Sequence, residues 1–536
     1  MHSRHKIGLL SLLALALLAL GAGTSAPAFA AEDTKPAPPA APELGLDPLA
    51  PQTVALPGGV TPAYGQRSLS EGEWRFDFHG FLTAPLVIGF GDRAMPLPGQ
   101  SGTTLHTPPA VPDDLETFSH TGVVPTTYVQ LNFSEGTSLV QANMSILARQ
   151  ANASTSFLEP ASQVGVNDLL VSVLPKIENL RTEVLVGAFA SRYGATGEYD
   201  EGRYGTPLIA RVNGIGERIT MRGRLGNFVL LAEEGVAGQS NKAGTAVTPD
   251  VWNDFANPNE GTSFVAHGHL GAKGWGLAQL GLHYLHAWSQ DDRANNVVNG
   301  IQMIDASQPD AKLDVVAGDL RVTAGRFGHF YGALSYVNAK HVGTLSRIIS
   351  ILNTRGGPGL IANYLGPNSN GNGNLTVIGG QYDLSIGKLV SYPVPFSGDG
   401  PDLFLSLFGM IAHVNSDDKT YDVNGRYYDG TTKWKAGSEL TYSFLPWLAV
   451  SGRYDKVVLD THDDCAGVSC SSYNFAVVSP RIILRSDWQS TDQIVIQYSH
   501  WFNGANTLIR VGDPPIENIN FIPDKDMISL SASMWW

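Results

Sequence analysis

The sequence predicts an all-β fold, a transmembrane antiparallel β-barrel of about 18 strands with short periplasmic turns and long extracellular loops. Two observations predict it. Apolar and polar residues alternate with a period of two from residue 74 to the C-terminus, and the links between these segments are alternately short and long. A soluble β-sandwich remains the alternative, although it would not show this regular asymmetry of link length.

The alternation is clearest in the last segment, where Ile528, Leu530, Ala532 and Met534 alternate with serines and the chain ends on Trp536. A strand places such serines on one face, whereas a helix would spread them around its axis. In the segment 473–486, Pro480 predicts a bulge or kink. About 18 segments alternate in this way, at residues 74–88, 123–134, 137–149, 164–174, 180–190, 214–224, 227–236, 262–272, 275–288, 312–324, 328–341, 374–386, 402–415, 432–444, 446–459, 473–486, 492–503 and 524–536.

Long links such as 91–122 and 342–373 are rich in Gly, Asn, Asp and Pro, and short links such as Leu225-Gly226 separate them. The link 387–401 is an exception, because it is long where a short one is due. An even strand count with this alternation places both termini on the periplasmic side. Tryptophans gather at both ends of the segments, as in aromatic belts: Trp74, Trp275, Trp447, Trp488, Trp535 and Trp536 near short turns, and Trp288, Trp434 and Trp501 near long loops.

The chain is predicted to have three parts. Residues 1–30 have a basic start, an apolar core and the small residues of Ala28-Phe29-Ala30, which indicate a cleaved signal peptide. An uncleaved anchor helix is the alternative. Residues 31–70 form a Pro/Ala-rich flexible lead-in, with no room for a plug domain such as TonB-dependent transporters carry, and residues 71–536 form the barrel.

Composition narrows the function classes. Asp and Glu number 49 against 35 Lys and Arg, giving a net charge of -14, which argues against a nucleic-acid partner. The sequence contains no GxSxG, HExxH or Walker A motif, so we expect no enzyme activity and no cofactor. A barrel enzyme with a catalytic histidine remains an alternative, because His413 and His500 fall on the lipid-facing parity. Histidines of the aromatic belt are the simpler interpretation of both residues.

Export signal, even-stranded barrel and terminal aromatic together resemble Gram-negative outer-membrane porins, without matching one subfamily. The resemblance implies a cell outer membrane location and a water-filled channel for small polar solutes and ions. A substrate-specific channel, for example for oligosaccharide or another anionic or polar nutrient, is the alternative. The resemblance also implies contact with outer-membrane lipid and lipopolysaccharide, and recognition of Trp536 by the barrel-assembly machinery. A homotrimer is left open.

If the apolar parity faces lipid, the opposite parity lines the lumen, and charged residues should avoid the lipid-facing parity because of their cost there. Loops could instead close this lumen. In porins the loop after the fifth strand folds inward, which would bring Glu198, Asp200 and Glu201 toward arginines of the wall; a surface loop is the alternative. The predicted pore-lining residues of the strands are Arg181, Glu183, Arg218, Arg222, Asp319, Arg321, Arg453, Asp455, Arg481 and Arg485.

These charges predict a weakly selective pore, leaning toward anions if the loop 191–213 stays outside and nearly neutral if it folds in.

Three other groups of residues could have a role. His267, His269 and His283 share the inward parity, where lumen polarity is the expected role and Zn²⁺ or Cu²⁺ binding the alternative; no carboxylate is evident beside them in the sequence. Cys465 and Cys470, at loop spacing in an exported protein, predict a disulfide, with free thiols as the alternative. The nearby Asp460, Asp463 and Asp464 indicate a solvated acidic loop, with Ca²⁺ binding as the alternative.

Overall fold

The computed structural model describes the strands and part of their connections. Among these residues no helix is both long enough and apolar enough to cross a membrane. The described residues are 75–90, 126–137, 139–151, 162–177, 180–193, 210–240, 262–274, 277–289, 295–298, 301–304, 310–341, 372–390, 400–421, 427–461, 472–488, 492–503, 509–511, 516–518 and 524–535.

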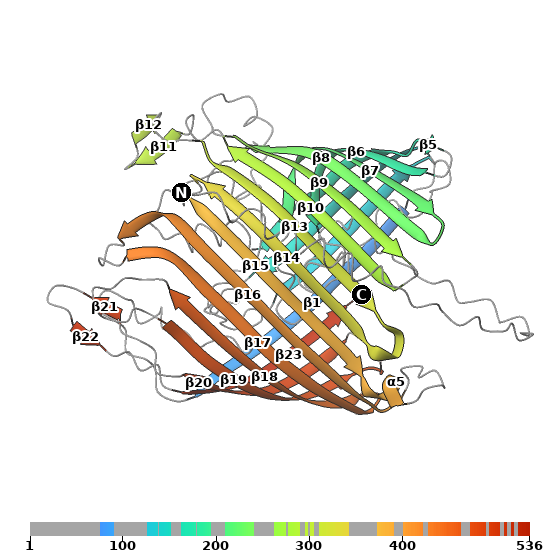
Figure 1. Ribbon diagram of the computed structural model, residues 1–536. Helices are drawn as coiled ribbons and strands as arrows, with labels where there is room; N and C mark the ends of the chain where they lie inside the picture. The colour runs from blue at the N-terminus through green and yellow to red at the C-terminus, as the bar shows by residue number, and fades with distance from the viewer. Residues whose placement is uncertain are drawn as a thin grey trace, which may run out of the picture. The chain divides into compact units, whose positions relative to one another are not determined.

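One antiparallel sheet of 19 strands dominates the described residues (Figure 1). Its strands are β1 (Arg75–Phe90), β2 (Thr126–Gly136), β3 (Val140–Ala151), β4 (Ser162–Val173), β5 (Lys176–Ile177), β6 (Leu180–Tyr193), β7 (Ala210–Leu225), β8 (Phe228–Ser240), β9 (Thr262–Gly274), β10 (Ala278–Ser289), β13 (Lys312–Thr323), β14 (His329–Lys340), β15 (Gly373–Ser385), β16 (Asp402–Tyr421), β17 (Tyr427–Leu445), β18 (Leu448–Thr461), β19 (Ser472–Arg485), β20 (Gln493–Asn503) and β23 (Lys525–Trp535). The short elements between them are β11 (Asn295–Val298), β12 (Ile301–Ile304), β21 (Ile509–Val511), β22 (Ile516–Asn518), η3 (Gly325–Phe327) and α5 (Ile386–Val390).

Each long strand of this sheet pairs with the next long strand along the chain, and the pairing returns to its start. β23 pairs with β1 from Phe81 opposite Trp535 to Phe90 opposite Asp526. The two-residue β5 continues β4 toward the turn before β6, so that eighteen of the 19 strands carry the ring of pairings. The predicted all-β antiparallel barrel is therefore confirmed, and each predicted segment coincides with one long strand.

The connections alternate as the sequence predicts. We call the end of the strands with short links the turn end and the opposite end the loop end. At the turn end, Leu225 pairs with Phe228 around Gly226, whose φ of +60° suits the first central position of a type II′ hairpin turn. The exceptional long link 387–401 lies at the turn end too, and α5 begins it.

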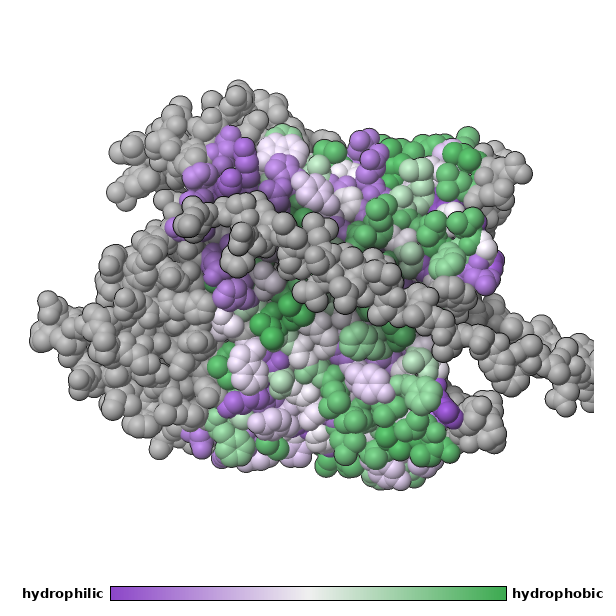
Figure 2. Space-filling view, viewed as in Figure 1, coloured by the Kyte–Doolittle hydropathy of each residue, from purple (hydrophilic) through white to green (hydrophobic). Residues whose placement is uncertain are grey.

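The two faces of each strand differ in exposure. On β10 the outward Leu282 is 46% exposed, whereas the inward Leu285 is 2% exposed. Figure 2 shows the same outer surface: hydrophobic residues gather toward the turn end at the lower right, and hydrophilic residues toward the loop end at the upper left. An apolar outer face on a ring of strands is what a barrel in hydrocarbon requires.

Three expectations about single residues need correction. Trp501 is 1% exposed and stacks on Phe475 with ring centroids 4.8 Å apart, so it lies on the inner wall and not in the outer aromatic belt. Glu217 and Glu234 are exposed on the outward face at the middle of β7 and β8, although charges were expected to avoid that face. Pro480 causes no bulge: β19 keeps one register with β18 and β20, and it only lacks ladder pairs with β20 at residues 479–480.

Candidate functional site

The inner wall changes character along the strands. In the turn-end half, inward side chains are polar or charged, as the sequence predicts. In the loop-end half they are apolar, because the outer face there carries polar residues such as Lys312 and Asp314, and apolar side chains then avoid water by facing inward. We call this inner apolar band the apolar collar: Leu170, Leu185, Phe189, Ala237, Val265, Leu285, Ala287, Leu313, Val315, Val337, Ala339, Leu375, Val377, Met410, Ala412, Val414, Val457, Phe475, Val477 and Trp501.

Buried ionisable side chains lie next to the collar on the turn-end side, and we call them the charged belt. Each projects from an inward position of its strand, which the period of two fixes once one neighbour is known to face inward. The members are Arg218, Glu233, His267, His269, His283, Asp319, Lys435, Glu439, Arg453, Asp455 and Arg481.

On β17–β20 each acid of the belt is paired with an arginine. Arg453 donates from Nε to Asp455 Oδ2 at 2.8 Å and from Nη2 to Oδ1 at 2.9 Å. Arg481 donates from Nη1 to Glu439 at 3.2 Å and from Nε to the Gln497 side chain at 2.6 Å. Because the partners are buried together, charged hydrogen bonds from the arginines offset the desolvation free energy of each carboxylate.

On β7–β13 the belt forms a row across neighbouring strands. Glu233 accepts a hydrogen bond from Thr220 at 3.2 Å, and its carboxylate lies 3.9 Å from Nε of Arg218. Glu233 is directly opposite His269, which is directly opposite His283. Nε2 of His283 lies 3.2 Å from Oδ2 of Asp319, so the row ends on a carboxylate of β13.

Both clusters place acids beside bases within one wall. Such pairs reduce the net field that a passing ion meets, while leaving strong local dipoles for polar solutes. The arrangement can therefore orient hydrogen-bonding solutes with only weak preference for one sign of charge.

The structure places the predicted residues of the strands on inward positions and separates them into groups. Arg181 and Arg222 are directly opposite each other near the turn end, and Glu183 accepts a hydrogen bond from Ser172 at 2.9 Å. Arg321 lies on β13 next to the row, and Arg485 donates to the backbone carbonyl of Pro446 at 3.1 Å. Arg218, Asp319, Arg453 and Arg481 join the belt, so β7–β13 and β17–β20 each hold their own cluster.

Several predicted features lie outside the described residues. They are the acidic loop residues Glu198, Asp200 and Glu201, the cysteines Cys465 and Cys470, the acids Asp463 and Asp464, and the terminal Trp536. The disulfide, the inward loop and the assembly signal stay predictions.

The histidines His267, His269 and His283 are buried on the inner wall. The sequence shows no carboxylate beside them, but the fold brings one there: Asp319, 36 residues from His283, contacts it because the two strands are neighbours in the ring. Even so, no group of three or more His, Cys, Asp and Glu side chains in the described part of the chain is arranged to hold a metal ion.

Three members of the belt were missing from the predicted site. Lys435 and Glu439 lie on the polar parity of their segment, so the alternation alone could have found them. The alternation could not identify Glu233 as inward, because its neighbour Glu234 carries the same charge on the opposite face.

No protein-family model matches this chain, and no curated protein is similar to it in sequence. Solved structures resemble it at low identity. The outer membrane channel DcaP of Acinetobacter baumannii has a TM-score of 0.40 and 11% identity, over 87% of this chain and 100% of that one. OccK2 (OpdF) of Pseudomonas aeruginosa has a TM-score of 0.39 and 9% identity, over 86% of this chain and 97% of that one.

OmpT of Vibrio cholerae, an outer membrane protein solved in a trimer form, has a TM-score of 0.34 and 10% identity, over 86% of this chain and 99% of that one. The strand pairing and the two-faced strands, and not these similarities, establish the architecture of this chain. This chain forms an antiparallel β-barrel with an apolar outer face.

Proposed function

We propose that this protein is an outer-membrane channel through which small polar solutes and ions diffuse. The observation that carries the proposal is the two-faced ring of strands, apolar outside and charged inside over the turn-end half. About 18 strands enclose more space than their side chains can fill, so a wet lumen is expected. The proposal assigns no catalytic role to the protein.

A planar lipid bilayer tests the proposal directly. Purified protein added to one side should produce stepwise increases in conductance in salt solution. A bilayer that stays silent with correctly folded protein, shown by its heat-modifiable mobility in electrophoresis, would contradict a channel function.

A substrate-specific channel is the second candidate, and the apolar collar favours it. From the loop end to the turn end the inner wall changes from aliphatic side chains such as Val315 and Leu375 to the charged belt, so a path along it has two distinct environments. Such a path suits a solute with both apolar and polar parts. Liposome swelling with a solute series separates the two candidates, because a specific channel saturates whereas a general pore sorts solutes by size.

The remaining expectations belong to this proposal. Contact with lipopolysaccharide, recognition of Trp536 by the barrel-assembly machinery and assembly as a homotrimer follow from the porin resemblance. The disulfide Cys465–Cys470 would be found as a linked peptide by mass spectrometry of the non-reduced protein, and two alkylatable thiols would refute it.

A further inference from the structure

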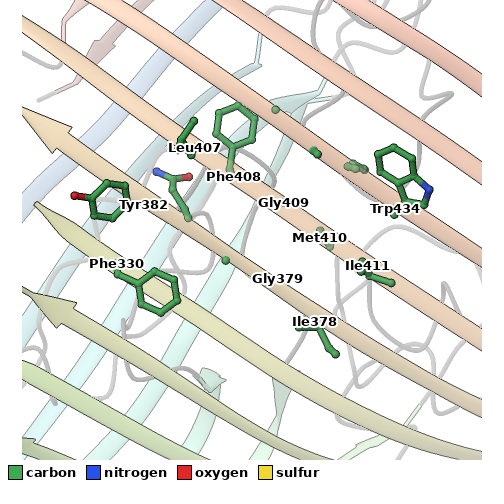
Figure 3. Close-up of a pocket in the computed structure, with 15 residues that line it drawn as sticks. Phe330, Ile378, Gly379, Tyr382, Leu407, Phe408, Gly409, Met410, Ile411 and Trp434 are labelled. Atoms are coloured by element: carbon green, nitrogen blue, oxygen red, sulfur yellow. The ribbon is translucent and has the colours of Figure 1, made fainter.

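A groove crosses the outer surface of β14–β17, and the small residues Gly380, Gly409 and Ala436 form its floor. Gly332 is directly opposite Gly380, Gly380 opposite Gly409, and Gly409 opposite Ala436. Four neighbouring strands thus lack a large outward side chain at the same level. The resulting groove has a volume of about 650 Å³ (Figure 3).

The rims of the groove are apolar. Phe330, Tyr382 and Leu407 lie on its turn-end side, and Ile378, Ile411 and Trp434 on its loop-end side (Figure 3). The groove opens outward: Ile411 is 51% exposed, whereas its inward neighbour Met410 is 4% exposed. On a barrel in a membrane, this face meets hydrocarbon.

Polar side chains cap the groove at its loop end. Two residues beyond the rim, Thr376 is directly opposite His413, and His413 is directly opposite Thr432. Nδ1 of His413 lies 2.7 Å from Oγ1 of Thr432. An outward histidine with hydroxyl neighbours therefore stands immediately above an apolar groove.

Two other cross-strand histidine pairs mark the same zone of the outer surface. Nδ1 of His286 lies 2.7 Å from Asp314, and Nδ1 of His500 lies 2.6 Å from Asp526. All three histidines sit outward near the loop ends of their strands, where the outer face changes from apolar to polar. That change is expected at the level of lipid headgroups.

Resting on the membrane location proposed above, we propose that the groove on β14–β17 binds one lipid molecule through its acyl chain and its phosphate-bearing headgroup. An acyl chain lies on Gly380, Gly409 and Ala436, and a phosphate or hydroxyl of the headgroup meets His413 and Thr432. The floor lets the acyl chain approach the backbone closely, and the cap supplies hydrogen-bonding partners at the level where the outer face changes from apolar to polar. The arrangement matches an amphipathic ligand at both ends, whereas a purely apolar protein contact would leave the cap without a counterpart.

The site can be filled without disturbing the barrel. A Cβ added at Gly409 meets nothing closer than 3.4 Å, the backbone oxygen of Lys435, so Gly409→Leu should fold. Gly318 on β13 offers a matched control, since it also faces outward, its added Cβ meets atoms no closer than 3.5 Å, and it lies outside the groove.

The test uses phosphatidylethanolamine with a photoactivatable diazirine in one acyl chain, in vesicles that otherwise contain phosphatidylethanolamine and phosphatidylglycerol. After illumination, mass spectrometry locates labelled peptides. We expect labelling concentrated on β15–β17 in the native protein and in Gly318→Leu, and reduced in Gly409→Leu to the level of other outward strands. Heat-modifiable mobility verifies that each variant is folded.

The cap is tested in the same vesicles. His413→Ala should weaken labelling of the groove, whereas His500→Ala, which removes a histidine of the same zone away from the groove, should not. Uniform labelling around the barrel would overturn the proposal. Labelling of every outward strand except β15–β17 would also overturn it, and would indicate that a second copy of the chain covers this face.

Discussion

His269 and His283 stack face to face on the inner wall, with ring centroids 4.3 Å apart and ring planes inclined by 15°. The two residues are directly opposite on β9 and β10. Asp319 fixes one end of the stack by its contact with Nε2 of His283. The stack is thus in contact with a carboxylate on its β13 side.

Asp319→Asn should destabilise the barrel. The His283–Asp319 pair is 2% and 1% exposed, so loss of the charged acceptor leaves a buried polar contact weakened, at a cost of about 1–3 kcal/mol. Asp314→Asn is the control, because Asp314 contacts His286 in a pair that is 34% and 40% exposed. Equilibrium unfolding in denaturant with refolding into vesicles measures both variants, and equal losses would contradict the role of burial.

The Arg453–Asp455 pair predicts a non-additive response. Arg453→Met leaves the carboxylate of Asp455 buried without its bidentate donor and should cost about 3–5 kcal/mol. The double variant Arg453→Met/Asp455→Leu should recover most of that loss, since a well-packed apolar pair can replace a buried ion pair. The same unfolding measurement applies. A double variant as unstable as the single one would mean that other residues of the wall depend on these charges.

For the outward carboxylates on β7 and β8 we expect the opposite effect, a gain in stability when a charge is removed. Glu217 and Glu234 are exposed at mid-strand, where a charge in hydrocarbon is unfavourable. Glu217→Leu should therefore stabilise the barrel, by less than about 2 kcal/mol because carboxylates cost less than basic residues at this depth. Met221→Leu, on the same face of β7, is the control for a change in apolar packing. Loss of stability in Glu217→Leu would indicate that a polar partner covers this face.

The period of two predicted the fold and most side-chain directions. It assigned Arg453, Arg481 and the three histidines to one face because each belongs to a long, regular segment. It could not reveal which residues of distant segments meet, such as His283 and Asp319, since that depends on strand register. It also could not foresee the apolar collar: the sequence shows where polarity alternates, but where a strand leaves the hydrocarbon, the preferred face reverses, as at Trp501 and Val315.

Ion preference tests the charged belt most directly. Arg218 and Arg222 lie on the inward face of β7, and Arg218 lies 3.9 Å from the carboxylate of Glu233. Replacing both arginines by Ser should shift the reversal potential in a salt gradient toward cations, because Glu233 then loses its nearest positive charge. Glu233→Gln is the matched control and should shift it toward anions.

The size of these shifts also tests the pairing argument. Since acids and bases neutralise one another within the wall, the native channel should show only weak selectivity, and each shift should shrink as ionic strength rises and the screening length falls below about 10 Å. Strong cation preference in the native protein would mean that acids outside the described strands dominate the narrowest section. An unchanged reversal potential in the Arg218/Arg222 variant would place that section away from β7, and the paired arginines of β18 and β19 would then be the next residues to replace.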